Sequence, residues 1–115
     1  MSYSQFTNLE MIETNFGITI VDKVGIFANL PEAEYSELLR QTLQENISLA
    51  LAINTEKARS ELIVTPILVE LRKQFQCQIS FFSGKEFNVD LEKGLTGFCD
   101  FLISRSPEQL LIRAC

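Results

Sequence analysis

The stretch GLTGFCDFLIS, residues 94–104, decides the β part of the predicted fold. Read as a strand, it directs alternate side chains to two faces: Cys99, Phe101 and Ile103 on one, and Phe98, Asp100 and Leu102 on the other. Both faces are apolar apart from Asp100, which predicts a central strand covered on both sides. Because an unpaired buried charge costs several kcal/mol, we expect another group to hold the Asp100 carboxylate.

Strands are also predicted on either side of this stretch. Residues 76–82 read as one strand and residues 86–90 as a second, with a break or bulge at Gly84 between them. Residues 91–97 contain two glycines and predict a hairpin loop. A further strand is expected to start in LLIRAC, residues 110–115. Together these segments predict an antiparallel β-meander.

The N-terminal half reads mainly as helix. A short helix is predicted within residues 7–14, followed by one or two short strands or an irregular segment around residues 16–21. Pro31 suits the first turn of a helix, and apolar residues then recur at spacings of three and four, which predicts a helix over residues 32–53. The whole chain is therefore expected to be α+β, with N-terminal helices packed on the β-meander in layers.

A second long helix is expected to follow at once. Asn54 and Thr55 offer caps, and the apolar pattern continues to about residue 75. Pro66 lies inside this pattern. Because proline lacks an N–H and its ring clashes with the carbonyl four residues earlier, we expect a kink or a restart there.

Composition limits the class of protein. The 115 residues are 46% hydrophobic and 22% charged, which fits one globular domain spanning residues 1–115. No apolar run approaches the roughly 20 residues of a membrane span, and the N-terminus lacks the features of a signal peptide, so we expect a cytoplasmic protein. The net charge of −5 argues against nucleic-acid binding through bulk charge, but leaves open a nucleic-acid contact through a bound metal ion and a local basic rim.

The absence of certain side chains excludes several chemistries. The sequence has no histidine, which rules out imidazole acid–base catalysis and most zinc sites. Cys77, Cys99 and Cys115 show no CxxC spacing and are expected to be core residues or free thiols rather than metal ligands.

Three carboxylates stand apart from ordinary surface charge. Asp100 lies in the apolar strand, Glu61 lies at the margin of the apolar stripe of the second helix, and Glu86 begins an alternating strand. A helix carboxylate and a strand carboxylate could converge on Mg²⁺, which takes oxygen ligands and can activate water against a phosphate. Glu86 also fits a solvent-facing position.

The other two carboxylates have simpler interpretations as well. Glu61 can pair with Lys57, four residues earlier on a solvated helix face. Asp100 can lie on an exposed sheet edge, or pair with a cation such as Arg105 or Lys85. Both interpretations remain open at the level of the sequence.

Two segments carry a resemblance to a known family. TEKARSELIVTPILVELRKQ, followed by ISFFSGKEFNVDLEKGLTGFCDFLISRSPEQL, resembles an uncharacterised bacterial family of the PD-(D/E)XK, or restriction-endonuclease-like, superfamily. The resemblance covers roughly residues 55–113. It implies a Mg²⁺-dependent phosphodiesterase site in which Asp100, in GFCDF, is the strand aspartate and Glu61, in ARSE, is the helix acid. Both would be catalytic residues and metal ligands.

The sequence departs from the family pattern at one strand. The E-x-K strand that completes the site in this superfamily would follow Cys115, and LLIRAC does not supply it. The chain thus resembles the first half of the nuclease core. Its uncovered sheet edge predicts a homo-oligomer. We expect a non-catalytic oligomeric or protein-interaction module. The alternative is a Mg²⁺-dependent nuclease completed by another chain.

Overall fold

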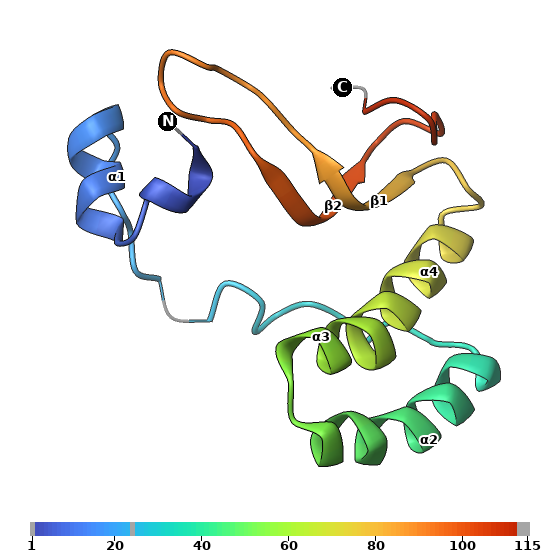
Figure 1. Ribbon diagram of the computed structural model, residues 1–115. Helices are drawn as coiled ribbons and strands as arrows, with labels where there is room; N and C mark the ends of the chain where they lie inside the picture. The colour runs from blue at the N-terminus through green and yellow to red at the C-terminus, as the bar shows by residue number, and fades with distance from the viewer. Residues whose placement is uncertain (1, 24, 113–115) are drawn as a thin grey trace. The chain divides into compact units, whose positions relative to one another are not determined.

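The computed structural model describes residues 2–23 and 25–112 and shows an α+β chain, in which helices precede an antiparallel β-hairpin (Figure 1). The elements follow in the order η1 (Tyr3–Gln5), α1 (Leu9–Phe16), α2 (Glu37–Ile53), α3 (Glu56–Arg59), η2 (Ser60–Val64), α4 (Thr65–Gln74), β1 (Ser80–Glu86) and β2 (Phe98–Ser104).

The described residues form two compact units. The first unit contains the chain up to residue 32 together with residues 84–100, and the second contains residues 33–83 together with residues 101–112. The ends of β1 and β2 near their connecting loop belong to the first unit, and the helices α2, α3 and α4 belong to the second.

In the first unit, α1 forms close to the predicted position. The Asn8 side chain caps its N-terminus by accepting a 2.8 Å hydrogen bond from the Met11 N–H, and Gly17 ends it with a φ of +61°. The ring of Phe6, before α1, lies beside that of Phe16 at its last residue, with ring centroids 5.6 Å apart. Residues 18–23 have no regular secondary structure, which agrees with the irregular alternative for this stretch.

The N-terminal segment is tied to the loop end of the β-hairpin. The Tyr3 N–H donates a 2.7 Å hydrogen bond to the Thr96 carbonyl, and the Tyr3 hydroxyl donates one of 2.5 Å to the Phe87 carbonyl. Beyond the named strands, the Phe87 N–H still donates to the Gly97 carbonyl at 2.7 Å. The predicted hairpin loop is therefore confirmed, because the chain pairs with itself on both sides of residues 91–94.

In the second unit, α2 begins later than the sequence indicated. It starts at Glu37 rather than at residue 32, because Ser36 is the N-cap. The Ser36 Oγ accepts a 3.1 Å hydrogen bond from the Leu39 N–H, while the Ser36 N–H is bound by the Glu70 carboxylate at 2.6 Å. A contact with a distant helix thus sets the start of α2, and the preceding proline does not.

The second long helix is continuous through three segments. Thr55 caps α3 by accepting a 3.1 Å hydrogen bond from the Ala58 N–H, as predicted. Next, η2 is a π-helical segment in which the Thr65 N–H bonds to the Ser60 carbonyl, five residues back. Pro66 follows in the first turn of α4. Regular α-helical bonding therefore resumes in α4, with Pro66 in its first turn, because a π-helical turn absorbs the missing N–H and the bulk of the ring.

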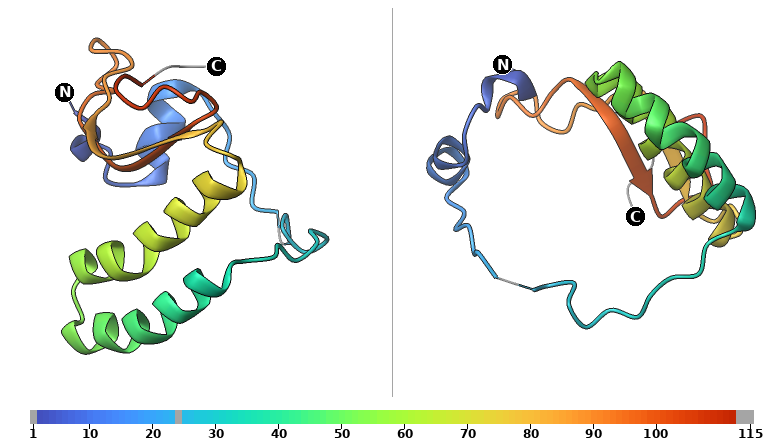
Figure 2. Two further views of the ribbon diagram at one scale, coloured as in Figure 1. Left: turned by 90° about the vertical axis from the view of Figure 1, so that its right-hand side faces the viewer. Right: turned by 90° about the horizontal axis from the view of Figure 1, so that it is seen from below.

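The helix α2 and the continuous helix α3–η2–α4 lie side by side and form a helical hairpin, shown from two directions in Figure 2. Asn54 makes the turn between them, with a φ of +57°. Ala50 of α2 is fully buried and Ala58 of α3 is nearly so, at 7% exposure. Small side chains at these two points let the helix backbones approach closely.

The sheet is smaller than the predicted meander. Its described part contains two strands, β1 and β2, hydrogen-bonded to each other. The strand β1 starts at Ser80 rather than at residue 76, because Gln76 and Cys77 have positive φ values of +53° and +59°. Gly84 lies within β1 at a φ of +63° and does not end it. Residues 110–112 are not in a strand, and residues 113–115 lie outside the described part.

The expectation of a central strand covered on both faces is wrong for β2. Phe98 is 72% exposed, and Asp100 is exposed as well. Because β2 has β1 as its described neighbour on one side, one of its edges carries no described strand. An apolar sequence predicts burial, but does not specify which elements provide it.

Candidate functional site

Glu61 lies on the solvent side of the π-helical segment η2. Its side chain is 63% exposed, and one carboxylate oxygen lies 3.9 Å from Nζ of Lys57, which is 84% exposed. This is the solvated i,i+4 pair that the sequence allowed. Exposed pairs of this kind contribute only a few tenths of a kcal/mol.

Asp100 lies in β2 with its side chain exposed. Within residues 2–23 and 25–112, no side chain forms an ion pair or hydrogen bond with its carboxylate. Of the interpretations that the sequence left open, the exposed position of Asp100 agrees with the structure, and the buried charge that needs a partner does not. Water solvates the carboxylate, so no compensating group is required.

The acidic residues that the sequence singled out are distributed over both units. Glu61 belongs to the second unit, whereas Asp100 and Glu86 belong to the first. Glu86 is exposed and accepts a 3.0 Å hydrogen bond from the Asn88 side chain. In the described part of the chain, no three His, Cys, Asp or Glu side chains gather where they could hold a metal ion. The Mg²⁺ site of Asp100 and Glu61 stays a prediction.

The sequence reading missed the buried carboxylate of Glu70. This residue lies on α4, is only 8% exposed, and reaches the N-terminus of α2. One of its oxygens accepts a 2.6 Å hydrogen bond from the Ser36 N–H, and the other accepts a 2.9 Å hydrogen bond from the Ser36 hydroxyl. Glu70 therefore acts as a cap that one helix supplies to the other.

The contacts of Glu70 favour its charged form. The backbone hydrogen bond from Ser36 lowers the pKa of Glu70 most, its burial opposes this, and the Ser36 hydroxyl, Gln74 and Lys73 lower the pKa further. A carboxylate at a helix N-terminus also interacts favourably with the helix dipole. The sequence did contain a signal, since LVELR places a carboxylate within an apolar run, as GFCDF does.

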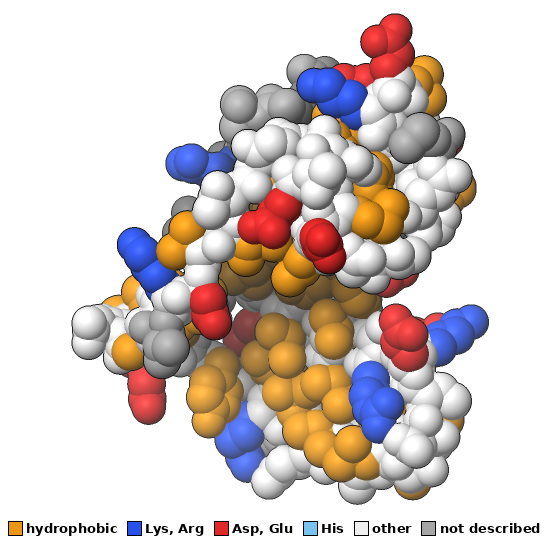
Figure 3. All heavy atoms as spheres, turned by 90° about the vertical axis from the view of Figure 1, so that its left-hand side faces the viewer, with side chains coloured by type: hydrophobic (Ala, Val, Ile, Leu, Met, Phe, Trp, Pro, Cys, Tyr) orange, Lys and Arg blue, Asp and Glu red, His pale blue; other side chains and the backbone are white. Residues whose placement is uncertain are grey.

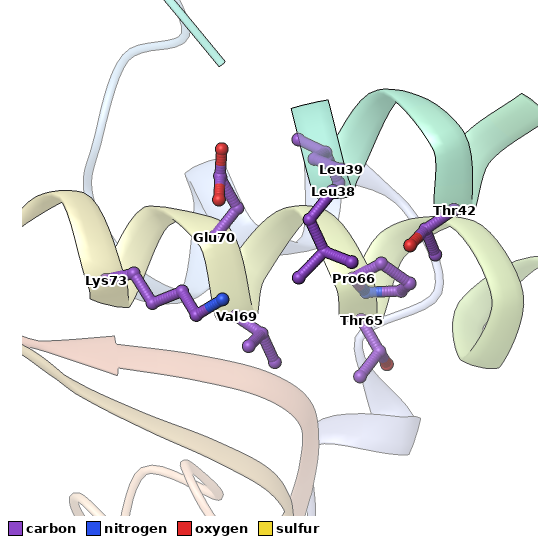
Figure 4. A pocket seen from close by; sticks show the side chains of 8 residues that line it. All are labelled: Leu38, Leu39, Thr42, Thr65, Pro66, Val69, Glu70 and Lys73. Atoms are coloured by element: carbon purple, nitrogen blue, oxygen red, sulfur yellow. The ribbon is translucent and has the colours of Figure 1, made fainter. Parts of the chain in front are cut away.

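The Glu70 side chain also marks the space between the two helices of the helical hairpin. On one side a pocket opens between α2 and α4, and Figure 4 shows the side chains that line it. Leu38, Leu39 and Thr42 come from α2, and Thr65, Pro66, Val69, Glu70 and Lys73 come from the other helix. The lining is apolar apart from the two threonines and, at one end, the charged side chains of Glu70 and Lys73.

A second pocket is formed by the same two helices and the segment before α2. Leu39 and Leu43 of α2 face Ile67 and Leu71 of α4, and Tyr35 adds an aromatic side chain. Figure 3 shows apolar side chains gathered over the helical hairpin, in the lower part of the view. The helical hairpin therefore leaves apolar side chains exposed after its two helices have packed against each other. This surface is the candidate functional site.

The thiols fit the expectation made from the sequence. Cys77 is exposed and Cys99 is half-buried, and both are free, while Cys115 lies outside the described residues. Among the described residues, no helix combines the length and the apolar content that a membrane crossing requires.

Comparison of the chain with protein-family models, with curated proteins and with solved structures finds no match in any of the three.

Proposed function

We propose that this chain is a non-catalytic interaction module that self-associates through the apolar surface of its helical hairpin. The observation that carries the proposal is the exposure of large apolar side chains on α2. Leu38 is 62% exposed, Leu51 56%, Ile53 51% and Leu49 50%. Single exposed apolar residues are normal on a soluble protein, but a group of them on one element is typical of an interaction surface.

The two pockets support the same proposal. Both lie between α2 and α4, and both are lined mainly by apolar side chains. A helical pair that is apolar on more than its contact face needs another layer to cover it. A second copy offers the same kind of surface, and a two-fold pairing would bury both copies at once. Each large side chain buried in this way contributes about 1.5–3 kcal/mol.

The proposal retains the nuclease-like ancestry that the resemblance of residues 55–113 implies. In this view Asp100 and Glu61 are remnants of a Mg²⁺ site, and the chain serves as a structural partner. The exposed Glu61–Lys57 pair supports this assignment, because a cation at Glu61 would compete with an ammonium group already beside it. The alternative function is a Mg²⁺-dependent nuclease that another chain completes, and metal-dependent cleavage of DNA tests it.

The oligomeric state tests the proposal directly. Size-exclusion chromatography with light scattering should show the wild-type chain as a dimer or higher oligomer at micromolar concentrations. Leu38→Asp places a charge in the exposed apolar surface and should yield monomers. Gln44→Asp is the matched control, because Gln44 is an exposed polar residue on the same helix, and this variant should associate like the wild type.

Circular dichroism separates loss of association from loss of folding. Leu38 is largely exposed, so Leu38→Asp should keep the helical signal of the wild type. A wild-type chain that is monomeric over the whole concentration range would contradict the proposal. Equal association of the Leu38→Asp variant and the wild type would contradict the assigned surface.

A further inference from the structure

The side chain of Gln109 binds both backbone groups of Phe81. Its Oε1 accepts a 3.0 Å hydrogen bond from the Phe81 N–H, and its Nε2 donates a 2.5 Å hydrogen bond to the Phe81 carbonyl. A primary amide offers the same donor and acceptor as a peptide group. Gln109 thus provides Phe81 with the two hydrogen bonds that a neighbouring strand would otherwise make.

These contacts lie on the outer edge of β1. The N–H and the carbonyl of one strand residue point to the same side of the strand. Because both groups of Phe81 are taken by Gln109, they face away from β2, which pairs with β1 on the other side. Figure 1 shows the chain turning back after β2 toward the start of β1. The outer edge of β1 is therefore occupied at this residue.

We propose that the outer edge of β1 at Phe81 is a binding site for an extended peptide strand of a partner protein, and that Gln109 occupies this site in the unbound chain. The Gln109 side chain indicates the class of ligand, because the group that it places in the site is an amide, as a peptide group is. Addition of a strand to a sheet edge is a common mode of peptide recognition, in which main-chain hydrogen bonds supply the affinity.

The segment that carries Gln109 can be displaced without uncovering a large core. The two leucines after Gln109 bury little surface, since Leu110 is 74% exposed and Leu111 58% exposed. The residue before Phe81 has a buried polar group without a partner in the part of the chain that the structure describes. Ser80 is fully buried, and its Oγ has no hydrogen-bond partner in the described chain. Such a group favours any rearrangement that gives it a partner.

The side chains beside this edge specify which strands fit best. Phe81 stacks on Phe101 of β2, with ring centroids 6.0 Å apart, and both rings are half-buried. A β-branched or aromatic side chain opposite Phe81 would extend this row of cross-strand contacts. We therefore assign the ligand as an extended segment rich in residues such as Val, Thr or Tyr.

The test uses a labelled peptide of about nine alternating Thr and Val residues, long enough to form one strand. Fluorescence anisotropy should show that Gln109→Ala binds it roughly tenfold more tightly than the wild type, because two competing hydrogen bonds are gone. Gln78→Ala, a change at an exposed glutamine outside the strands, should bind like the wild type. A peptide that is N-methylated at alternate residues should bind to none of them.

Amide hydrogen exchange shows whether the peptide binds at Phe81. Exchange at the Phe81 N–H should be faster in free Gln109→Ala than in the wild type, and the unmethylated peptide should slow it again. Equal peptide affinity of Gln109→Ala and the wild type would overturn the proposal, as would equal binding of the N-methylated peptide. If Gln109→Ala self-associates without binding the peptide, the occupant is a second copy, and the proposed ligand is wrong. These outcomes are independent of Leu38, so this inference and the proposed function can fail separately.

Discussion

The side-chain amide of Asn46 in α2 donates a 2.9 Å hydrogen bond to the backbone carbonyl of Leu62 in η2. Leu62 is four residues before Pro66, which has no N–H to donate to that carbonyl. Asn46 therefore supplies a hydrogen bond that the proline removes from the helix. The same contact ties α2 to the second helix of the helical hairpin at the point where the regular helical bonding is interrupted.

Replacing Asn46 with Ala should lower the free energy of unfolding by about 1–2 kcal/mol. The reason is that the half-buried Leu62 carbonyl loses its donor. Urea unfolding followed by circular dichroism measures this loss. Gln44→Ala, at an exposed position on the same helix, should change the free energy of unfolding by less than about 0.5 kcal/mol.

Because Asn46 replaces a hydrogen bond that Pro66 cannot make, substitutions at these two residues should have non-additive effects on the free energy of unfolding. In Pro66→Ala, residue 66 regains an N–H that can bond to the Leu62 carbonyl. The loss caused by Asn46→Ala should therefore be smaller in the Pro66→Ala background than in the wild type, by about 0.5–1.5 kcal/mol. A double-mutant cycle gives this difference, and strictly additive losses would show that the two residues do not share the Leu62 carbonyl.

The stability of the helical hairpin should depend on the ionisation of Glu70. Hydrogen bonds from Ser36 lower the pKa of Glu70 below its ordinary value of 4.5. Because the folded-state pKa is the lower one, the unfolded chain binds more protons in acid. The contribution of Glu70 is complete above its unfolded-state pKa, and is lost as the pH falls through the folded-state pKa.

Thermal unfolding at a series of pH values measures this contribution. The wild type should melt at a higher temperature than Glu70→Gln above about pH 5, and the difference should shrink as the pH is lowered below the ordinary glutamate pKa of 4.5. Glu45→Gln serves as the control, since Glu45 is an exposed carboxylate on α2. This variant should melt at the same temperature as the wild type at every pH. A constant difference between wild type and Glu70→Gln at all pH values would contradict the assigned role.

The loop end of the β-hairpin should not tolerate a side chain at Gly97. Its φ is +138°, and a Cβ built there would lie 3.0 Å from Cδ2 of Tyr3. Gly97→Ala should lower the free energy of unfolding by about 1–3 kcal/mol, through backbone strain together with the clash. Gly84→Ala is the matched control, because Gly84 also has a positive φ but no atom within 4 Å of the added Cβ. Its loss should be the smaller of the two, and equal losses would show that the contact with Tyr3 has no effect.

The proposed non-catalytic role predicts no cleavage of plasmid or single-stranded DNA by the wild-type chain in Mg²⁺ or Mn²⁺. Asp100→Ala and Glu61→Ala should therefore behave like the wild type in this assay. Both residues are exposed, and the one ion pair involved is weak, so neither change should lower the free energy of unfolding by more than about 0.5 kcal/mol. Metal-dependent cleavage that Asp100→Ala abolishes would establish the nuclease alternative instead.

Local signals in the sequence were sufficient for several elements. The cap at Thr55, the restart at Pro66 and the hairpin loop over residues 91–97 were all predicted, and the structure confirms each one. These features depend on neighbouring residues alone. A threonine hydroxyl caps the third N–H after it, a proline disrupts its own helical turn, and glycines permit a tight loop.

Other features depended on contacts between distant residues. The sequence placed the start of α2 at residue 32, but the Glu70 carboxylate binds the Ser36 N–H from a helix 34 residues further on and moves the start to Glu37. The sequence left open whether Asp100 is buried or exposed, and Glu70 did not stand out. The structure shows Asp100 exposed and Glu70 buried.

The sequence by itself determined the order of the helices and the β-hairpin along the chain, because capping, proline and glycine effects act within a few residues. Only the tertiary structure decided which charge is buried and which strand edge is occupied. Glu70 is stable inside because Ser36 supplies two donors, and the β1 edge is closed because Gln109 returns to Phe81 from 28 residues away. A buried polar group is tolerated only where partners converge, and that convergence is a property of the fold.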